Sequence, residues 1–225
     1  MIPKLSRIYI YPIKSFPPVP VNEAVAEDRG LAGDRRWMLV DENNRFISLR
    51  EERKMLEFSI ENEDSHWLVT HDAGVIRIPK ILTTGRDLEV TIWNDTVNAW
   101  EADGNLSAWF SSVLGRNCRL VYMPPAGHRP VKSTWRLKNE EVSFADGYPY
   151  LMINENSLSA LSDKVGKHMD IRRFRPNLVF SGSVASEEFT YREVKIGEVI
   201  LNGLKPCIRC VVVTLDPVSG EQSKE

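Results

Sequence analysis

The chain has 225 residues, of which 42% are hydrophobic and 27% are charged, so it is long enough and apolar enough to bury a full globular core. Its formal net charge of −2 excludes binding to nucleic acid or membranes through overall charge, but not a local basic pocket. Three cysteines are too few for a disulfide scaffold. The N-terminal apolar run is broken by Pro12 and Lys14, so it is neither a signal peptide nor a membrane span. We therefore expect a cytoplasmic protein without a nucleic-acid partner.

Short strands separated by turns are predicted over most of the first hundred residues. Residues 5–13 alternate as a strand, which Pro12 either stops or places at a sheet edge. Three hairpins follow, across the turn-forming residues 41–44, 72–74 and 94–95. Several strands at regular spacing indicate a small barrel or sandwich.

Two helices interrupt the strands. Apolar residues recur with helical spacing after Asp103, a possible N-cap, and the helix is expected to stop at Gly115. A second helix is predicted between Asn154 and Gly166. The Pro-rich and charged segment 123–141 indicates a linker, so we expect one domain at residues 1–123 and another at 124–225.

The second part of the chain is also rich in strand signals. Strands are predicted at residues 148–153 and 177–182, as a hairpin at 192–203, and in the β-branched run after Cys210. The whole chain is therefore predicted to be a β-rich α+β protein with a few helices.

Cys207 and Cys210 form a C-x-x-C pair with Arg209 between them. Structural zinc needs four ligands, and the remaining Cys118 and four unpaired histidines do not supply them at the usual spacing. A thioredoxin-type pair would precede a helix, whereas the following "VVVTL" favours a strand. The pair is then either two small buried hydrophobic residues or a source of one thiolate ligand for a metal whose other ligands come from a cofactor.

Basic residues stand at three separated places near strand ends. They are Lys14 with Ser15, Arg35 with Arg36, and the arginines of "RRFRPN" at residues 172–177. Alternation along a strand would send Arg35 and Arg36 to opposite faces. Each arginine alone is compatible with a solvated surface position, but together they could converge on a phosphate or pterin-like anion, which a guanidinium fork matches. The sequence contains no glycine-rich phosphate loop.

Four motifs occur in an order and spacing that resemble the MOSC family with its N-terminal β-barrel region. They are "IYIYPIKS", "GLAGDRRWMLVD" followed by "ISLREERKML", "RFRPNLVFSG" and "CIRCVVVTLDPVSG". The resemblance runs from Ile8 to the end of the chain and is greatest to the members that reduce N-hydroxylated compounds. It implies a small N-terminal β-barrel region followed by a MOSC-type β-barrel. Because family members continue past the last motif, we expect the second barrel to be truncated.

The resemblance also implies a function. Such a protein binds a molybdenum cofactor, in which molybdopterin holds the metal, and reduces amidoximes, hydroxylamines and N-hydroxylated bases. A separate electron-donor protein, either a reductase or a protein of the ferredoxin or cytochrome type, would supply the electrons. The family's motifs imply that Cys210 is the metal ligand and that Cys210 and Asn177 are the catalytic residues. The implied cofactor-binding residues are Lys14, Ser15, Arg35, Gly147, Tyr148, Pro149, Arg175, Cys207, Ile208 and Arg209.

Two alternatives remain open. MOSC domains also occur in molybdenum-cofactor sulfurases, so the chain could be a cofactor or sulfur carrier without reductase activity. Any pyridoxal phosphate binding would then belong to another domain, because nothing in this sequence resembles one that binds it. The other alternative is a non-catalytic protein-binding fragment with a structural thiol pair.

Overall fold

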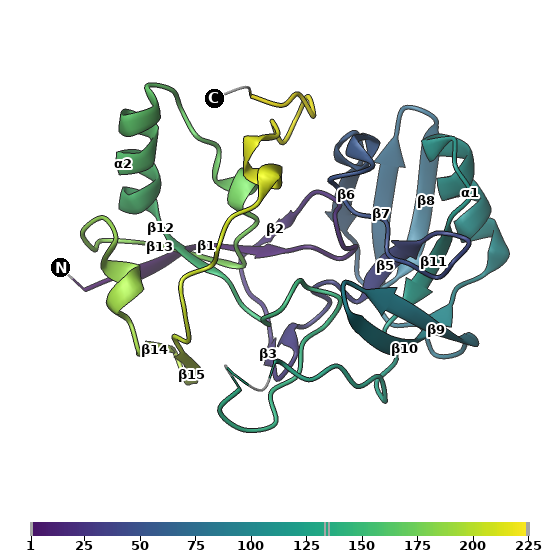
Figure 1. Ribbon diagram of the computed structural model, residues 1–225, viewed down its shortest axis with the longest axis horizontal. Helices are drawn as coiled ribbons and strands as arrows, with labels where there is room; N and C mark the ends of the chain where they lie inside the picture. Colours follow the sequence, from purple (N-terminus) through teal and green to yellow (C-terminus); the bar gives the residue numbers. More distant parts are fainter. Residues whose placement is uncertain (1, 133, 135, 224–225) are drawn as a thin grey trace.

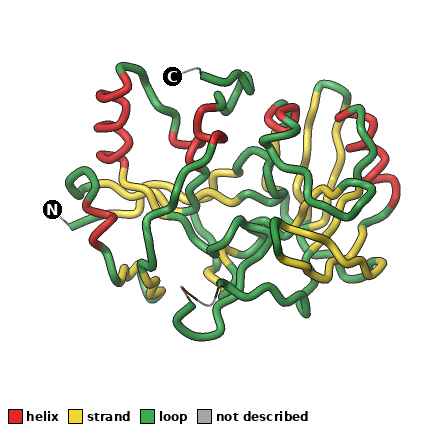
Figure 2. Tube along the Cα trace, in the orientation of Figure 1, coloured by secondary structure: helices red, strands yellow, loops and turns green. Residues whose placement is uncertain are grey.

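The computed structural model describes residues 2–132, 134 and 136–223, and most of its regular structure is strand (Figures 1 and 2). The strands are β1 (Lys4–Ile10), β2 (Val19–Val21), β3 (Ala26–Glu27), β4 (Gly30–Leu31), β5 (Trp37–Val40), β6 (Ser59–Asn62), β7 (His66–His71), β8 (Gly74–Pro79), β9 (Arg86–Ile92), β10 (Asp95–Glu101), β11 (Arg119–Tyr122), β12 (Met152–Asn154), β13 (Leu178–Ser181), β14 (Glu193–Ile196) and β15 (Val199–Asn202). The helices are α1 (Gly104–Leu114), α2 (Glu155–Val165) and the short 3-10 helices η1 (Arg53–Leu56), η3 (Ile171–Phe174), η4 (Glu187–Thr190) and η5 (Val211–Thr214).

The described strands form open sheets. Two sheets have four strands, in the orders β12-β13-β1-β2 and β5-β11-β10-β9, and a third has the order β6-β7-β8. The pairs β3-β4 and β14-β15 form two-stranded sheets. The predicted β-rich α+β class is confirmed, although the hydrogen-bonding pattern of these sheets does not close either barrel.

Strand β1 brings together segments from distant parts of the chain. It pairs antiparallel with both β13 and β2, so that Ile8 lies opposite Leu178 on one side and Val21 on the other. Because β1 is an interior strand, Pro12 ends it and does not mark a sheet edge. Figure 1 shows this sheet and α2 on one side of the molecule, with α1 and strands β5 to β11 on the other. The expected domain boundary near residue 124 stays a prediction.

Local sequence signals give most of the helices and hairpins correctly. The Asp103 side chain accepts a hydrogen bond from the Asn105 N–H at the start of α1, and Gly115 ends that helix in the left-handed conformation. At the start of α2 the Asn154 side chain accepts a hydrogen bond from the Asn156 N–H, and Gly166 ends the helix in the left-handed conformation. The hairpins β7-β8, β9-β10 and β14-β15 form as predicted. In the hairpin at residues 41–44, the returning segment makes only isolated bridges, between Val40 and Phe46 and between Arg45 and Thr91. Within the described residues, no helix has the length and apolar character needed to cross a membrane.

The main hydrophobic core holds the N-terminal segments and α1 together. Phe16 packs against Phe58 and Phe110, with ring centroids 5.0 and 5.6 Å apart. Trp37 is completely buried in the same cluster, and Leu215, near the C-terminal end, also belongs to it. The segment that follows Cys210 is therefore anchored to the N-terminal core.

The strand predicted after Cys210 is wrong. Residues 211–214 form the 3-10 helix η5, in which Val213 N–H donates to the Cys210 carbonyl and Leu215 N–H to the Val212 carbonyl. Valine favours a strand only where a neighbouring strand supplies ladder hydrogen bonds and side-chain contacts. No described strand pairs with this segment, so its backbone forms local hydrogen bonds instead.

Candidate functional site

A cavity of about 1200 Å³ lies among the β1–β2 connection, the segment 145–153, the R-P-N segment and the chain from β14 to η5. Segments far apart in sequence bring their polar side chains to it. All twelve residues expected at the site line this cavity: Lys14, Ser15, Arg35, Gly147, Tyr148, Pro149, Arg175, Asn177, Cys207, Ile208, Arg209 and Cys210. Their individual roles stay predictions.

Lys14 places a buried ammonium group at this cavity. Its backbone N–H donates to the Trp37 carbonyl over 2.8 Å, which fixes the segment after β1 against β5. The Lys14 side chain is only 6% exposed, and its Nζ donates to Asp146 Oδ1 over 2.6 Å. Burial lowers the pKa of Lys14, while the neighbouring Asp146 carboxylate favours the charged form.

Asp146 was missed by the sequence analysis, although it directly precedes the predicted Gly147. The Lys14 charge holds the pKa of the Asp146 carboxyl well below its usual range, so this carboxyl is ionised at neutral pH. Asp146 Oδ1 also accepts a hydrogen bond from Trp93 Nε1 over 3.2 Å. The buried Arg129 holds the backbone here by donating to the carbonyls of Ser143, Ala145 and Asp146.

Arg35 lies beside Lys14 in the cavity wall. The sequence predicts that Arg35 begins a strand. In the structure it precedes β5 and has a left-handed φ of 47°. Its Nη1 donates to Asp34 Oδ2 over 2.6 Å and to Asn177 Oδ1 over 3.0 Å. Arg36 points elsewhere and forms an ion pair with Glu27. The two arginines thus separate as expected, but through the turn geometry and not through strand alternation.

Arg175 is the third cation at the cavity. Its Nη2 donates to the Phe16 carbonyl over 2.8 Å, and its guanidinium lies 4.4 Å from the centre of the Tyr11 ring. The Arg35 guanidinium lies 4.2 Å from the same ring. Burial lowers the pKa of Arg175 to about 10 and raises that of Tyr11. No carboxylate of the described residues forms a salt bridge with Arg175.

The charges at this end of the cavity do not balance. Lys14, Arg35 and Arg175 are cationic, whereas Asp34 and Asp146 provide the neighbouring carboxylates. One positive charge is therefore in excess in a partly desolvated place, where an unpaired charge is costly. An anionic ligand would remove that cost.

The backbone around the cavity is also unusual. Six non-glycine residues of the described chain have positive φ, and five of them line this cavity: Ser15, Arg35, Trp93, Arg175 and Ser186. Such conformations cost about 1–3 kcal/mol each and cluster at functional sites. The bulky Trp93, with a φ of 55°, is the clearest case. The left-handed conformation of Trp93 could not be predicted from the sequence, because the next two residues, Asn94 and Asp95, already give a good turn signal.

The thiol pair lies on an irregular segment of the same cavity. Cys207 is exposed and Cys210 is half-buried, so the interpretation of two buried hydrophobic residues is wrong. Arg209 donates to the Phe174 carbonyl over 3.3 Å, and Ile208 between the thiols is 89% exposed. Among the residues described, no three side chains of His, Cys, Asp or Glu gather into a metal site. A metal bound by Cys210 would thus need ligands from a cofactor.

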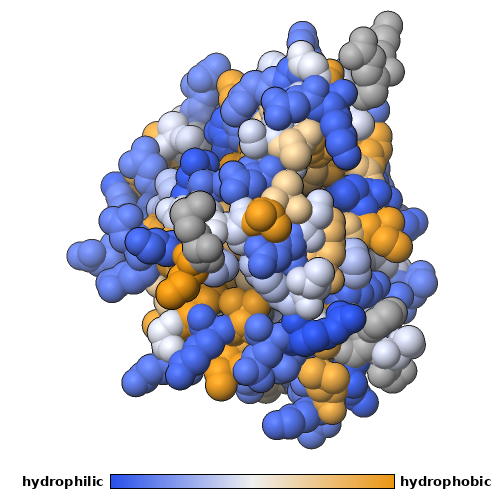
Figure 3. All heavy atoms as spheres, turned by 90° about the vertical axis from the view of Figure 1, so that its left-hand side faces the viewer, coloured by the Kyte–Doolittle hydropathy of each residue, from blue (hydrophilic) through white to orange (hydrophobic). Residues whose placement is uncertain are grey.

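One part of the cavity wall is apolar. Side chains from the β14-β15 hairpin line it, namely those of Val194, Val199, Ile200 and Leu201. Ile200 is also exposed, as is the nearby Phe189. Figure 3 views this side of the molecule, where apolar patches interrupt a largely hydrophilic surface. The cavity therefore offers both buried cations and a hydrophobic surface.

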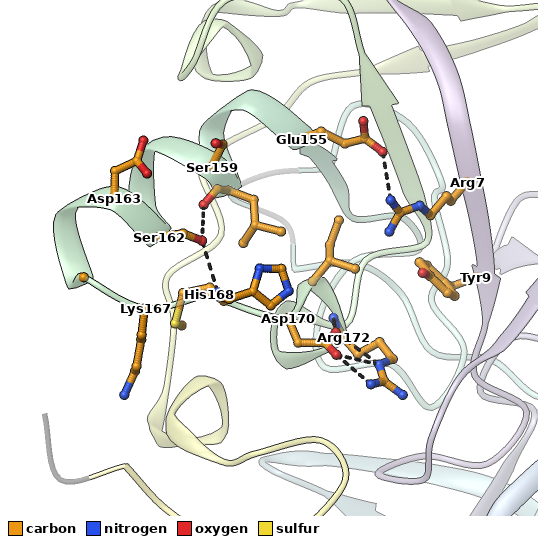
Figure 4. Close-up of a pocket in the computed structure, with 14 residues that line it drawn as sticks. Arg7, Tyr9, Glu155, Ser159, Ser162, Asp163, Lys167, His168, Asp170 and Arg172 are labelled. Carbon is orange, nitrogen blue, oxygen red and sulfur yellow. Dashed lines mark hydrogen bonds and ion pairs between the residues drawn. The ribbon is translucent and has the colours of Figure 1, made fainter.

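A second cavity, of about 900 Å³, lies between β1, α2 and η3 (Figure 4). Its charged side chains pair with one another: Arg7 lies 3.4 Å from Glu155, and Arg172 forms several hydrogen bonds with the carboxylate of Asp170. His168 also points into it. No expected site residue lines this cavity, and its pairs leave no comparable excess of positive charge.

Comparison with known proteins gives two domain matches. Residues 2–117 match the MOSC N-terminal beta barrel domain, and residues 139–225 match the MOSC domain. Three similar relatives are mitochondrial amidoxime-reducing components: component 1 of Mus musculus (30% identity, 96% of this chain and 66% of the relative), component 2 of Rattus norvegicus (32%, 96% and 68%) and component 1 of Homo sapiens (28%, 98% and 68%). The chain thus spans about two thirds of the length of these relatives.

Proposed function

Because this chain belongs to the family that joins a MOSC N-terminal β-barrel domain to a MOSC domain, we propose that it is an oxidoreductase that binds a molybdenum cofactor and reduces small N-hydroxylated compounds. Amidoximes, hydroxylamines and N-hydroxylated bases are the proposed substrates. The observation that carries the proposal is that residues of four separate sequence motifs line one cavity with an excess of positive charge.

The chain's own residues would hold the cofactor at both of its ends. Lys14, Arg35 and Arg175 would bind the phosphate, because guanidinium and ammonium groups form strong charge-assisted hydrogen bonds with phosphate oxygens. Cys210 would contribute a thiolate to the metal at the other end, where its half-buried sulfur is free. When bound, the molybdenum cofactor supplies the two-electron redox chemistry.

The other residues at the cavity would position the ligands. Asn177 orients Arg35 through the hydrogen bond to its Nη1 and would lie on the substrate side of the site. The apolar wall from β14 and β15 would bind the hydrophobic body of a substrate and exclude water from it. We further propose that electrons come from a separate donor protein, either a reductase or one of the ferredoxin or cytochrome type.

Metal analysis tests this proposal directly. The protein is purified from cells that make the cofactor, and its molybdenum content is measured together with that of two matched variants. We expect roughly one molybdenum per chain, lost in Cys210→Ala and retained in Cys207→Ala. A folded protein without molybdenum would contradict the proposal.

Activity then separates the proposed reductase from a cofactor carrier. Benzamidoxime with an artificial electron donor is expected to be reduced by the wild-type protein and by Cys207→Ala, but not by Cys210→Ala. A protein that holds molybdenum and leaves benzamidoxime unchanged would instead be a cofactor or sulfur carrier.

A further inference from the structure

The ion pair between Lys14 and Asp146 has an unequal environment. Lys14 Nζ is buried in the protein, whereas the Asp146 side chain is 74% exposed and lines the cavity. The carboxylate therefore lies on the ligand side of the pair. It is the nearest anion to a lysine that is expected to bind phosphate, and its Oδ1 is only 2.6 Å from Nζ.

The surrounding charges all favour an anion at this position. The positive charges of Lys14 and, to a smaller extent, Arg35 lower the pKa of the Asp146 carboxyl. The Asp146 carboxylate in turn favours the charged form of Arg175. The three cations expected to hold a phosphate thus already act on one carboxylate. A phosphate placed on Lys14 with Asp146 still present would meet like-charge repulsion at short range.

Trp93 fixes the carboxylate in this position. Its Nε1 donates to the same Oδ1 that accepts from Lys14, and the Arg50 guanidinium lies 4.6 Å from the centre of the indole ring. The left-handed backbone at Trp93 turns this large side chain toward Asp146 and is retained despite its strain.

We propose that the Asp146 carboxylate occupies the place of an anionic ligand, and that a phosphate monoester binds Lys14 only when Asp146 is displaced from it. This inference deepens the proposed function, on which it rests for the identity of the phosphate as part of a cofactor. Asp146 is then a residue that sets the affinity and specificity of the anion site. It keeps the buried lysine paired in the free protein, and weakly charged anions do not displace it.

Calorimetric titration with phenyl phosphate at neutral pH and low salt tests the inference. Asp146→Asn is expected to bind phenyl phosphate at least tenfold more tightly than wild type, which corresponds to about 1.4 kcal/mol. Lys14→Gln is expected to lose binding. Glu63→Gln, which removes a carboxylate from an exposed pair with Arg77, is the control and should bind as wild type does. Equal or weaker binding by Asp146→Asn, or no binding by any variant, would overturn the inference.

A second variant keeps the test valid if Asp146→Asn does not fold. Trp93→Phe removes the hydrogen bond to Asp146 and leaves its charge, so we expect phenyl phosphate to bind two- to fivefold more tightly than in wild type. Unchanged or weaker binding by a folded Trp93→Phe would also overturn the inference. The outcome is independent of molybdenum: tighter binding by these variants in a protein that holds no molybdenum would support the anion site and contradict the proposed reductase.

Discussion

Arg35 Nη1 donates a hydrogen bond to Asn177 Oδ1 over 3.0 Å, and this bond joins two residues that are 142 positions apart. Asn177 Nδ2 donates in turn to the Tyr9 carbonyl, so one buried amide links the R-P-N segment to both β1 and Arg35, two residues before β5. The orientation of the cationic wall thus depends on a side chain that carries no charge itself.

Asn177→Ala is expected to destabilise the protein by about 1–3 kcal/mol, because it leaves the Tyr9 carbonyl without the side-chain donor and removes one acceptor of Arg35. Urea unfolding measures the change. Asn98→Ala provides the matched control, since Asn98 is exposed on β10, and it should change the free energy of unfolding by less than about 0.5 kcal/mol. Equal effects of the two substitutions would show that the buried bonds of Asn177 contribute nothing specific.

The parts of the fold that the sequence predicts are those that neighbouring residues determine. Caps such as Asp103 and Gly115, and the turn between β7 and β8, involve residues only a few positions apart. The segment 211–214 could not be predicted in this way, because the same valines form a strand or a 3-10 helix depending on whether a partner strand is available.

In the candidate site, too, contacts between residues far apart in the sequence could not be predicted. Lys14, Arg35 and Arg175 were found as basic residues within motifs, but the carboxylates that face them were not. Asp146 lies 132 positions from Lys14, and no spacing in the sequence links the two. The excess of positive charge, which supports an anion site, could be counted only after the fold had brought these residues together.

Arg172 and Arg173 are adjacent in the sequence but bind different partners. Arg173 donates to the Leu215 carbonyl over 2.6 Å and to Asp216 Oδ2 over 2.7 Å, and it thereby anchors the segment after Cys210, whereas Arg172 binds Asp170. Arg173→Met is expected to increase hydrogen exchange of the amides of residues 211–216 at least tenfold, because their anchor is lost. Arg172→Met should leave that exchange unchanged. If both variants exchange alike, the guanidinium of Arg173 does not hold this segment.

The Lys14–Asp146 pair also predicts a dependence of stability on pH. The folded-state pKa of Asp146 lies below its ordinary value of 3.8, so the pair's contribution is present above that value and is lost as the pH falls below it. We expect Asp146→Asn to be less stable than wild type by at most about 1 kcal/mol near pH 6, because Lys14 loses its ionised partner but solvent screens the exposed carboxylate. The difference should begin to shrink as the pH falls through 3.8, and it should keep shrinking toward the lower folded-state pKa of Asp146. Urea unfolding of both proteins across this range measures it, and a constant difference would contradict the role of the ionised carboxylate.

Gly203 closes the β14-β15 hairpin that forms the apolar wall of the cavity. A Cβ built on it would lie 2.1 Å from the Tyr191 carbonyl oxygen, and because this atom belongs to the backbone, the clash cannot be relieved by a change of rotamer. Gly203→Ala is therefore expected to separate the ends of the hairpin and to destabilise the protein by about 1–3 kcal/mol. Gly104→Ala is the control, because a Cβ at Gly104 meets no atom within 4 Å and alanine favours the helix α1. Thermal unfolding should give a lower midpoint for Gly203→Ala and an unchanged or slightly higher one for Gly104→Ala. Equal midpoints for wild type and Gly203→Ala would mean that the hairpin can shift away from residue 191 without loss of packing.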